Sequence, residues 1–254
     1  MQDIFIKIYG AKILNSCLFK KFKIDIIIRA FIRISSNLFL PIYFKLFSSS
    51  SNLLHLTDKN NIVVSLTTFP NRINSVWLVI ECLLRQKIKP NRLVLWLSND
   101  QFPSKKYLPS QLLEYENIGL EIYLCEGDLK SHKKYYYGLI QFPEDILITI
   151  DDDFFYPSNL ISDLIKLHKN YPNAICCERG HLMKVNMGKL ERYNDWEYLN
   201  TGRGPSFDIF QTSGGGTLYP PSSLHAEVLN KEYFLKHCKT ADDVWLNMMS
   251  QLNS

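Results

Sequence analysis

Ile146-Leu-Ile-Thr-Ile-Asp-Asp-Asp153 is a short apolar run that stops at three consecutive carboxylates. Such a run of isoleucine and leucine predicts a strand buried on both faces, as in a mostly parallel α/β sheet. In open sheets of that class, ligands bind in the crevice past the carboxyl ends of the strands. We therefore expect Asp151, Asp152 and Asp153 to project into that crevice, with strand alternation placing the first and third on one side.

The three adjacent carboxylates repel one another unless a cation neutralises them, and a hard divalent ion with oxygen ligands meets that need. The same cluster also suits a plainer structural role. Asp153 fits the cap of a helix whose start would include Pro157 and Asn159. On these residues alone, a metal site and a helix cap both stay open.

The composition is that of a globular protein. The 254 residues suffice for one large α/β domain with an appendage, and 46% of them are hydrophobic and 21% charged. The six cysteines form no CxxC pair and no zinc-binding spacing, which favours reduced thiols and a cytosolic compartment. Residues 1–60 contain nine Lys or Arg and three Asp, a net charge of +6, although the whole chain carries only +4.

Residues 1–52 are predicted to be a basic amphipathic helical segment that ends in a flexible linker, Ser48–Asn52. The longest uncharged run, Ile34–Phe44, is shorter than the roughly 20 residues of a spanning helix. Charges also interrupt any signal-peptide core. We therefore expect a cytoplasmic protein whose N-terminal segment lies peripherally on the anionic inner face of the cytoplasmic membrane. The alternative is ordinary helix packing against the domain.

Strands and helices alternate between residues 60 and 153. This βαβαβαβ order predicts a parallel sheet with right-handed crossovers, whose strand ends bring Thr67, Asp100, Asp128 and Asp151 to one edge. The predicted strands cover 61–68, 93–97, 120–124 and 146–150, and the predicted helices begin near Ser75, Ser110 and Tyr135.

The second half of the chain is less regular. We expect a helix over 160–169, a short strand over 173–177, and a final helix that begins at Thr240 as its cap, with two carboxylates in its first turn. Between them, Ser213–Pro221 contains three consecutive glycines. It is predicted to be a loop in which positive φ angles let a ligand approach closely.

Five short motifs occur in order at the predicted strand ends and helix starts. They are Val64-Ser-Leu-Thr-Thr-Phe-Pro-Asn-Arg72, Lys133-Lys134, Asp151-Asp-Asp153, Gly214-Gly-Gly-Thr-Leu-Tyr-Pro-Pro221 and Asp242-Asp-Val-Trp-Leu246. Together they resemble bacterial glycosyltransferases of the GT-A type, in particular small family 2-like enzymes of surface-polysaccharide clusters. The resemblance covers the chain from about residue 60 to 250.

The resemblance implies a GT-A fold over 60–254, with 60–153 as the nucleotide-binding half and 154–254 as the acceptor half. It implies a nucleotide-sugar donor whose two phosphates reach the carboxylates through Mn²⁺ or Mg²⁺. Asp153 would ligate the metal directly, with Asp151 near the ribose or a metal-bound water. His225 lies near the spacing of a late metal-binding histidine. The implied donor-binding residues are Thr67, Phe69, Arg72, Asp100, Lys133, Lys134, Asp151, Asp152, Gly215 and Gly216.

The carboxylates of the last helix are similar to the Glu-Asp pair of family 2 enzymes. The resemblance implies that Asp243 is the general base of an inverting transfer and that Asp242 is its neighbour at the acceptor. The structural alternative is a charged helix N-terminus that complements the helix dipole. Larger family 2 enzymes tend to have Pro-x-Tyr-Asn where this chain has Thr-Thr-Phe-Pro, so the contacts to the nucleotide base stay open. Retention of configuration also stays open.

The expected function is that of a metal-dependent glycosyltransferase acting on a glycan or lipid-linked acceptor in the synthesis of a bacterial surface polysaccharide, lipopolysaccharide or capsule. One alternative is a nucleotidyltransferase, although Ser65–Arg72 lacks the glycine-rich loop usual there. Another is a non-catalytic, membrane-associated sugar-binding scaffold. A haloacid-dehalogenase-type phosphohydrolase would carry the acidic motif on its first strand. Nucleic-acid binding is disfavoured because the basic residues alternate with aliphatic ones and no reading motif is present.

Overall fold

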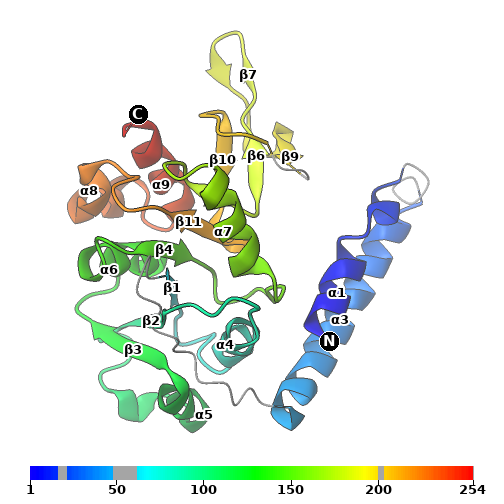
Figure 1. Ribbon diagram of the computed structural model, residues 1–254, viewed down its shortest axis with the longest axis vertical. Coiled ribbons are helices and arrows are strands. Elements are labelled where there is room, and N and C mark those ends of the chain that lie inside the picture. The colour runs from blue at the N-terminus through cyan, green and yellow to red at the C-terminus, as the bar shows by residue number, and fades with distance from the viewer. Residues whose placement is uncertain (17–21, 48–61, 200–202, 254) are drawn as a thin grey trace.

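A six-stranded sheet forms the centre of the molecule, in the strand order β3-β2-β1-β4-β11-β5 (Figure 1). The computed structural model describes residues 1–16, 22–47, 62–199 and 203–253, so the predicted linker Ser48–Asn52 lies outside the described residues. Four neighbouring strands run parallel: β1 (Ile62–Thr67), β2 (Arg92–Ser98), β3 (Leu120–Cys125) and β4 (Ile146–Thr149).

The sheet continues beyond β4 through a strand of opposite direction. β11 (Thr217–Tyr219) pairs antiparallel with β4 and with β5 (Cys176–Cys177). The prediction that Ser213–Pro221 is entirely a loop is therefore wrong for residues 217–219. The three residues Thr-Leu-Tyr have high strand propensity, and the free edge of β4 supplies their hydrogen-bond partners.

Helices cover both faces of the sheet, and strand alternation divides the core between them. Val64 packs in one cluster with α4 (Val76–Leu84), α5 (Ser110–Glu114) and α7 (Leu160–Asn170). Val63 packs in the other with α6 (Lys133–Gln141), α8 (Lys231–His237) and α9 (Asp242–Gln251). The predicted fold class, an α/β fold with a mostly parallel sheet flanked by helices, is confirmed.

Strand β4 is buried throughout, as its unbroken apolar sequence predicts. Helix α6 lies close against it, because a Cβ atom at Gly138 would come within 2.8 Å of Leu147 Cδ1. The absence of a side chain at Gly138 lets the helix approach the strand, and the N-terminus of α6 thereby reaches the carboxyl end of the sheet.

The irregular second half contains small antiparallel elements beside the main sheet. One sheet has the order β10-β6-β9. A separate hairpin pairs β7 with β8 and extends from the body of the protein (Figure 1). The bounds of these strands are β6 Gly180–Leu182, β7 Val185–Asn186, β8 Lys189–Leu190, β9 Glu197–Leu199 and β10 Ile209–Gln211.

In the described part of the N-terminal segment, the helices α1 (Gln2–Tyr9) and α3 (Ile24–Leu46) pack side by side. Within the described residues, α3 is long and apolar enough to cross a membrane by length and composition, a test that core helices and signal sequences also pass. The prediction considered only the uncharged run Ile34–Phe44, whereas α3 is longer and continues through Arg29 and Arg33. Near its C-terminus, Leu40 and Phe44 join the core cluster that contains α4.

Candidate active site

The three carboxylates follow β4 at the carboxyl edge of the parallel strands. Asp152 is almost fully buried and accepts hydrogen bonds from Thr68 Oγ1 at 2.5 Å and from Arg72 Nη1 at 2.7 Å. Arg72 Nη2 also lies 3.0 Å from Asp153, whose side chain is 41% exposed. Both carboxylates thus share one arginine, and the predicted strand alternation does not hold. The strand ends at Thr149, and the two residues lie in a turn.

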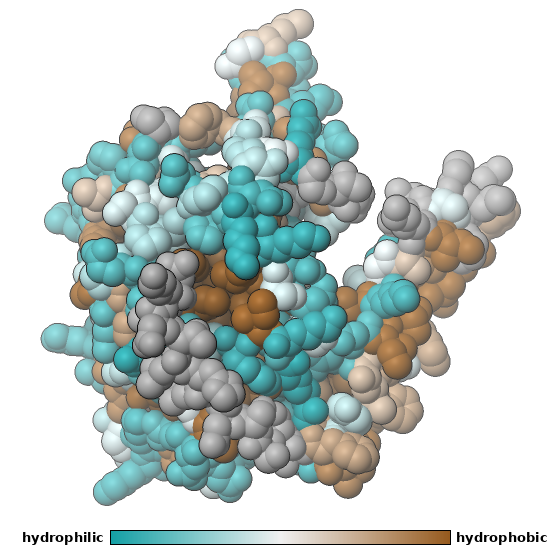
Figure 2. Space-filling model, in the orientation of Figure 1, coloured by the Kyte–Doolittle hydropathy of each residue, from teal (hydrophilic) through white to brown (hydrophobic). Residues whose placement is uncertain are grey.

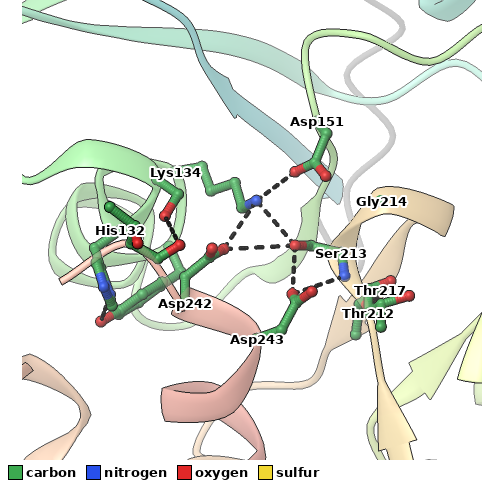
Figure 3. Close-up of polar contacts among 12 residues, drawn as sticks. His132, Lys134, Asp151, Thr212, Ser213, Gly214, Thr217, Asp242 and Asp243 are labelled. Carbon is green, nitrogen blue, oxygen red and sulfur yellow. Dashed lines mark hydrogen bonds and ion pairs between the residues drawn. The ribbon is translucent and has the colours of Figure 1, made fainter. Parts of the chain in front are cut away.

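Lys134 connects the strand-end carboxylates with those of α9 (Figure 3). Its Nζ lies 2.5 Å from Asp151 Oδ1, 2.9 Å from Asp242 Oδ2 and 2.9 Å from Ser213 Oγ. These contacts use all three hydrogens of the ammonium group. Burial would lower the pKa of Lys134, but the charges of Asp242 and Asp151 outweigh burial and raise it. The lysine therefore stays charged and holds two distant parts of the chain together.

The two carboxylates at the start of α9 differ in their surroundings. Asp243 accepts hydrogen bonds from the Ser213 backbone N–H at 3.0 Å and from Ser213 Oγ at 2.7 Å. Burial and the negative charge of Asp242 raise the pKa of Asp243. For Asp242, burial also acts to raise the pKa, but Lys134 outweighs it and the pKa is lowered. Adjacent carboxyls with opposite pKa shifts are a common arrangement in acid–base sites.

The buried side chain of Tyr156 contacts the backbone of the acidic motif. Its hydroxyl accepts a hydrogen bond from the Asp151 backbone N–H at 2.9 Å and lies 3.3 Å from the carbonyl oxygen of Gly214. Tyr156 is buried, and burial raises its pKa, so the hydroxyl stays protonated. It therefore joins the backbone of the acidic motif to the glycine-rich segment.

The three glycines are explained by contacts within the protein. A Cβ atom at Gly214 would lie 3.2 Å from Asp151 Oδ2, and one at Gly215 would lie 2.3 Å from Arg179 Cβ. Gly216 alone of the three has a positive φ, +96°. The close approach predicted for a ligand is thus an approach of other protein segments, and Gly215 and Gly216 do not line the adjacent cavity.

A cavity of about 600 Å³ opens at this edge of the sheet. This volume lies within the range of small-molecule sites, about 300–1,000 Å³. Most of the predicted site residues meet there. The predicted residues that line it are Thr67, Phe69, Arg72, Lys133, Lys134, Asp151, Asp152, Asp153 and Asp242.

Besides Gly215 and Gly216, three further predicted site residues do not line the cavity. Asp100 is exposed in the turn after β2, and the next residue, Gln101, faces the cavity instead. Asp243 lies next to the lining residue Asp242, against Ser213. His225 caps the short helix η7 (Ala226–Leu229) and accepts a hydrogen bond from the Glu227 backbone N–H.

An acidic–basic cluster after β3 contains the predicted Lys133 together with two residues, Asp128 and Lys130, that were not among the predicted site residues. Asp128 bonds to Lys133 Nζ at 2.6 Å and pairs with Lys130, and all three line the cavity. Burial alone would raise the pKa of Asp128, but the hydrogen bonds from the two lysines lower it to about 2. Lys130 has a positive φ of +56°, an uncommon backbone conformation for a residue with a side chain. The position of Asp128 after a predicted strand was the available signal.

The carboxylates after β4 suit a hard divalent cation that is held in part by the phosphates of a ligand. Within the described residues, no group of three or more His, Cys, Asp or Glu side chains is placed to hold a metal alone. Mg²⁺ is usually bound through one or two carboxylates together with substrate phosphates. Asp153 fits that role because it is the most exposed of the three. Burial and the charges of Asp151 and Asp152 raise its pKa despite Arg72, and a bound cation would offset this repulsion.

A larger cavity of about 1090 Å³ lies at the other end of β4, near Ile146, Tyr171 and Pro220. It contains none of the predicted site residues. Size alone would favour it, but the charged side chains that could bind a diphosphate converge on the smaller cavity. The smaller cavity is therefore the candidate active site.

No protein-family model and no curated protein sequence matches this chain. Among solved structures, it is similar to a 4-diphosphocytidyl-2C-methyl-D-erythritol synthase, with a TM-score of 0.41 and 12% identity over 75% of this chain and 85% of that one. For the Francisella tularensis 2-C-methyl-D-erythritol 4-phosphate cytidylyltransferase the values are 0.41 and 12%, over 74% and 86%. For S. aureus TarS 1–349 they are 0.44 and 17%, over 76% and 56%. Similarity at this level does not establish a function, which depends on the site residues.

Proposed function

We propose that this protein is a metal-dependent glycosyltransferase that moves a sugar from a nucleotide-sugar donor to an acceptor hydroxyl with inversion. One observation carries the proposal. Lys134, itself buried, bonds to Asp151 at the end of β4 and to Asp242 at the start of α9. The implied donor-binding carboxylates and Asp242, about 90 residues apart in the sequence, therefore meet at one cavity, and the implied general base Asp243 is the next residue along α9.

The donor's diphosphate would lie between the acidic motif and the basic groups of the cavity. A bound Mn²⁺ or Mg²⁺ would supply Lewis-acid stabilisation of the diphosphate leaving group. Arg72 already bridges Asp152 and Asp153, and its side chain is 41% exposed, so it can also donate to a phosphate oxygen. Lys133 and Lys130 line the same cavity and would offset the remaining phosphate charge.

In the proposed transfer, the acceptor oxygen attacks the anomeric carbon from the face opposite the diphosphate. The bond from that carbon to the phosphate oxygen breaks, and its electron pair leaves with the diphosphate. Asp243 accepts the proton of the acceptor hydroxyl. Its raised pKa makes it a stronger base than an ordinary aspartate, and two hydrogen bonds from Ser213 hold its carboxylate in place.

The proposed acceptor is a glycan or a lipid-linked precursor of a bacterial surface polysaccharide, with the reaction at the inner face of the cytoplasmic membrane. The second candidate function is nucleotidyl transfer. Lys130 and Lys133 line the same cavity, and two lysines beside an acidic motif would also suit the extra phosphate of a nucleoside triphosphate. The two reactions release different products, so they can be separated directly.

The test incubates the full chain and Mn²⁺ either with UDP, GDP, CMP or dTDP sugars and a panel of glycoside acceptors, or with nucleoside triphosphates and sugar phosphates. We expect release of the free nucleotide from one class of nucleotide sugar, lost on chelation of the metal. Asp243→Asn should lower that rate by about 10²–10⁴-fold. The matched change Asp195→Asn, at an exposed aspartate, should leave it unchanged. Pyrophosphate release would favour nucleotidyl transfer, and release of neither product would favour the sugar-binding scaffold.

A further inference from the structure

The long N-terminal helix α3 exposes an apolar stripe along its whole length. Its residues recur three or four positions apart, which places them on one side of the helix. The opposite side is buried, as Ile32, Leu40 and Phe44 show. Figure 2 shows the hydrophobic surface extending along this helix. We call α1 and α3 together the N-terminal hairpin, and the stripe the hairpin face. The residues of the hairpin face are Ile27, Phe31, Ile34, Leu38 and Ile42, exposed by 66%, 70%, 67%, 59% and 51%.

The exposed apolar surface is wider than this stripe. Ile24 and Leu46 at the two ends of α3, and Ile4 and Ile8 on α1, are also exposed. Soluble monomers rarely expose contiguous apolar patches larger than a few hundred Å² unless something binds there. Within the described residues, these side chains remain open to solvent, which leaves them available to a partner.

The charge of the segment identifies the kind of partner. Residues 1–60 carry a net charge of +6, and exposed Lys7, Lys23, Arg33 and Lys45 flank the apolar residues on the two helices. Apolar side chains beside basic ones suit an anionic lipid surface, where the former enter the acyl boundary and the latter meet the headgroups. A second copy of the chain would bring the same positive charge to the interface, which opposes self-association.

Contacts on the other side of the hairpin fix how it can meet a membrane. Gln2 Nε2 donates to the carbonyl oxygen of Tyr156 at 3.1 Å, and Asp3 accepts from the Ser158 backbone N–H at 2.7 Å. The guanidinium of Arg85 lies 4.9 Å from the centre of the Phe44 ring. Because these ties hold one side of the hairpin against the domain, only the opposite side is free to enter lipid.

We propose that the hairpin face binds the surface of an anionic bilayer with α3 parallel to the membrane plane. This inference concerns where the protein lies and does not depend on the reaction proposed above. Gln2 contacts the same tyrosine whose hydroxyl supports Asp151, so the membrane-bound helices lie directly against the loop that carries the acidic motif.

Flotation of the full chain with vesicles tests the proposal. The vesicles contain either equal parts of phosphatidylglycerol and phosphatidylcholine or phosphatidylcholine alone. We expect the wild type to float with the anionic vesicles and less with the neutral ones. The triple variant Phe31→Glu, Ile34→Glu, Leu38→Glu should bind at least about tenfold more weakly, since each change removes a large apolar group from the lipid contact.

The matched control is Tyr107→Glu with Met187→Glu, which changes two exposed apolar residues far along the chain from the hairpin. It should float like the wild type. Equal flotation of the triple variant and the wild type would overturn the proposal. So would a concentration-dependent dimer in place of vesicle binding, or retention in cell membranes after an alkaline carbonate wash, which indicates a spanning helix. Circular dichroism and unfolding midpoints of all variants confirm that they fold.

Discussion

A lysine as deeply buried as Lys134 depends on its immediate partners. Two carboxylates and a hydroxyl surround its ammonium group. Removing the carboxylates would leave the lysine charge unpaired, and removing the lysine would leave the carboxylate charges unpaired. Removing one partner of a buried ion pair costs about 3–5 kcal/mol. We therefore expect Lys134→Met to lower the free energy of unfolding by about this amount in urea titrations.

The matched control for that change is Lys106→Met, at an exposed lysine. It should alter the free energy of unfolding by no more than about 0.5 kcal/mol, as surface substitutions usually do. Equal effects of the two substitutions would show that Lys134 does not hold the acidic motif to α9.

The pH dependence of turnover tests the role of Asp243. A base must be deprotonated, so the rate falls as the pH drops through its pKa. Burial and the charge of Asp242 raise that pKa. The fall of kcat/KM on the acid side of the pH profile should therefore occur at a higher pH than the pKa of an ordinary aspartate would give. Asp242→Asn removes one negative neighbour, and we expect the acid limb to move to lower pH.

Asp195→Asn, which changes an exposed aspartate, should leave the acid limb where it is. An acid limb that stays in place or moves to higher pH in Asp242→Asn would contradict the assignment of Asp243 as the base.

At the scale of single residues, the sequence predicts which groups gather but not how they pair. Asp151 to Asp153 and Lys134 were expected at the site because each lies at a strand end or a helix start. Lys134 was expected to bind a phosphate, but it bonds to Asp242. This pairing depends on how α9 packs against α6, and a local sequence pattern contains no information on that packing. The pairing of Asp128 with two lysines was missed for the same reason.

At the scale of elements, the glycine-rich segment is held by tight packing. Gly215→Ala would place a Cβ atom 2.3 Å from Arg179 Cβ, so the backbone of one segment must move. Overpacking of this kind typically costs about 1–3 kcal/mol. We expect a loss of unfolding free energy in that range, measured by chemical denaturation.

Gly204→Ala is the matched control, because its Cβ would lie at 3.7 Å from the Tyr171 hydroxyl, an ordinary contact, and its φ is not positive. This change should be close to neutral. A neutral Gly215→Ala would mean that the segment is not packed as the structure has it.

The strands β1, β2 and β4 were predictable because they are almost entirely buried and have nearly continuous apolar sequences, whereas the edge strand β3 mixes buried and half-buried residues. The strand β11 could not be predicted in this way. It has only three residues and follows three glycines, so it resembles a loop, and its strand structure depends on pairing with the edge of β4. The predicted cap at Thr240 is also wrong, since α9 has Ala241 as its N-cap and no side-chain cap. Such ends depend on tertiary contacts more than on local sequence.

At the scale of the whole molecule, α4 joins the N-terminal hairpin to the domain. Glu81 is 1% exposed and accepts hydrogen bonds from Arg85 and from the Tyr115 hydroxyl, each at 2.9 Å. Arg85 in turn packs over the rings of Tyr43 and Phe44. The positive charge of the N-terminal segment was evident from the composition. The role of Glu81 and Arg85 was not, because a Glu-Arg pair four residues apart is also typical of an ordinary helix surface. Its role at the hairpin follows only from the fold.

The most direct test of the proposed donor site is a thermal-shift screen of UDP, GDP, CMP and dTDP sugars, each with and without Mn²⁺, on the wild type and on Asp153→Ala. We predict that one nucleotide class raises the unfolding midpoint of the wild type only when Mn²⁺ is present, because ligand that binds the native state stabilises it. The same ligand should give no metal-dependent shift with Asp153→Ala. A wild type that shows no metal-dependent shift with any of these donors, or an equal shift in the variant, would contradict the assignment of the carboxylates after β4 as the metal and diphosphate site.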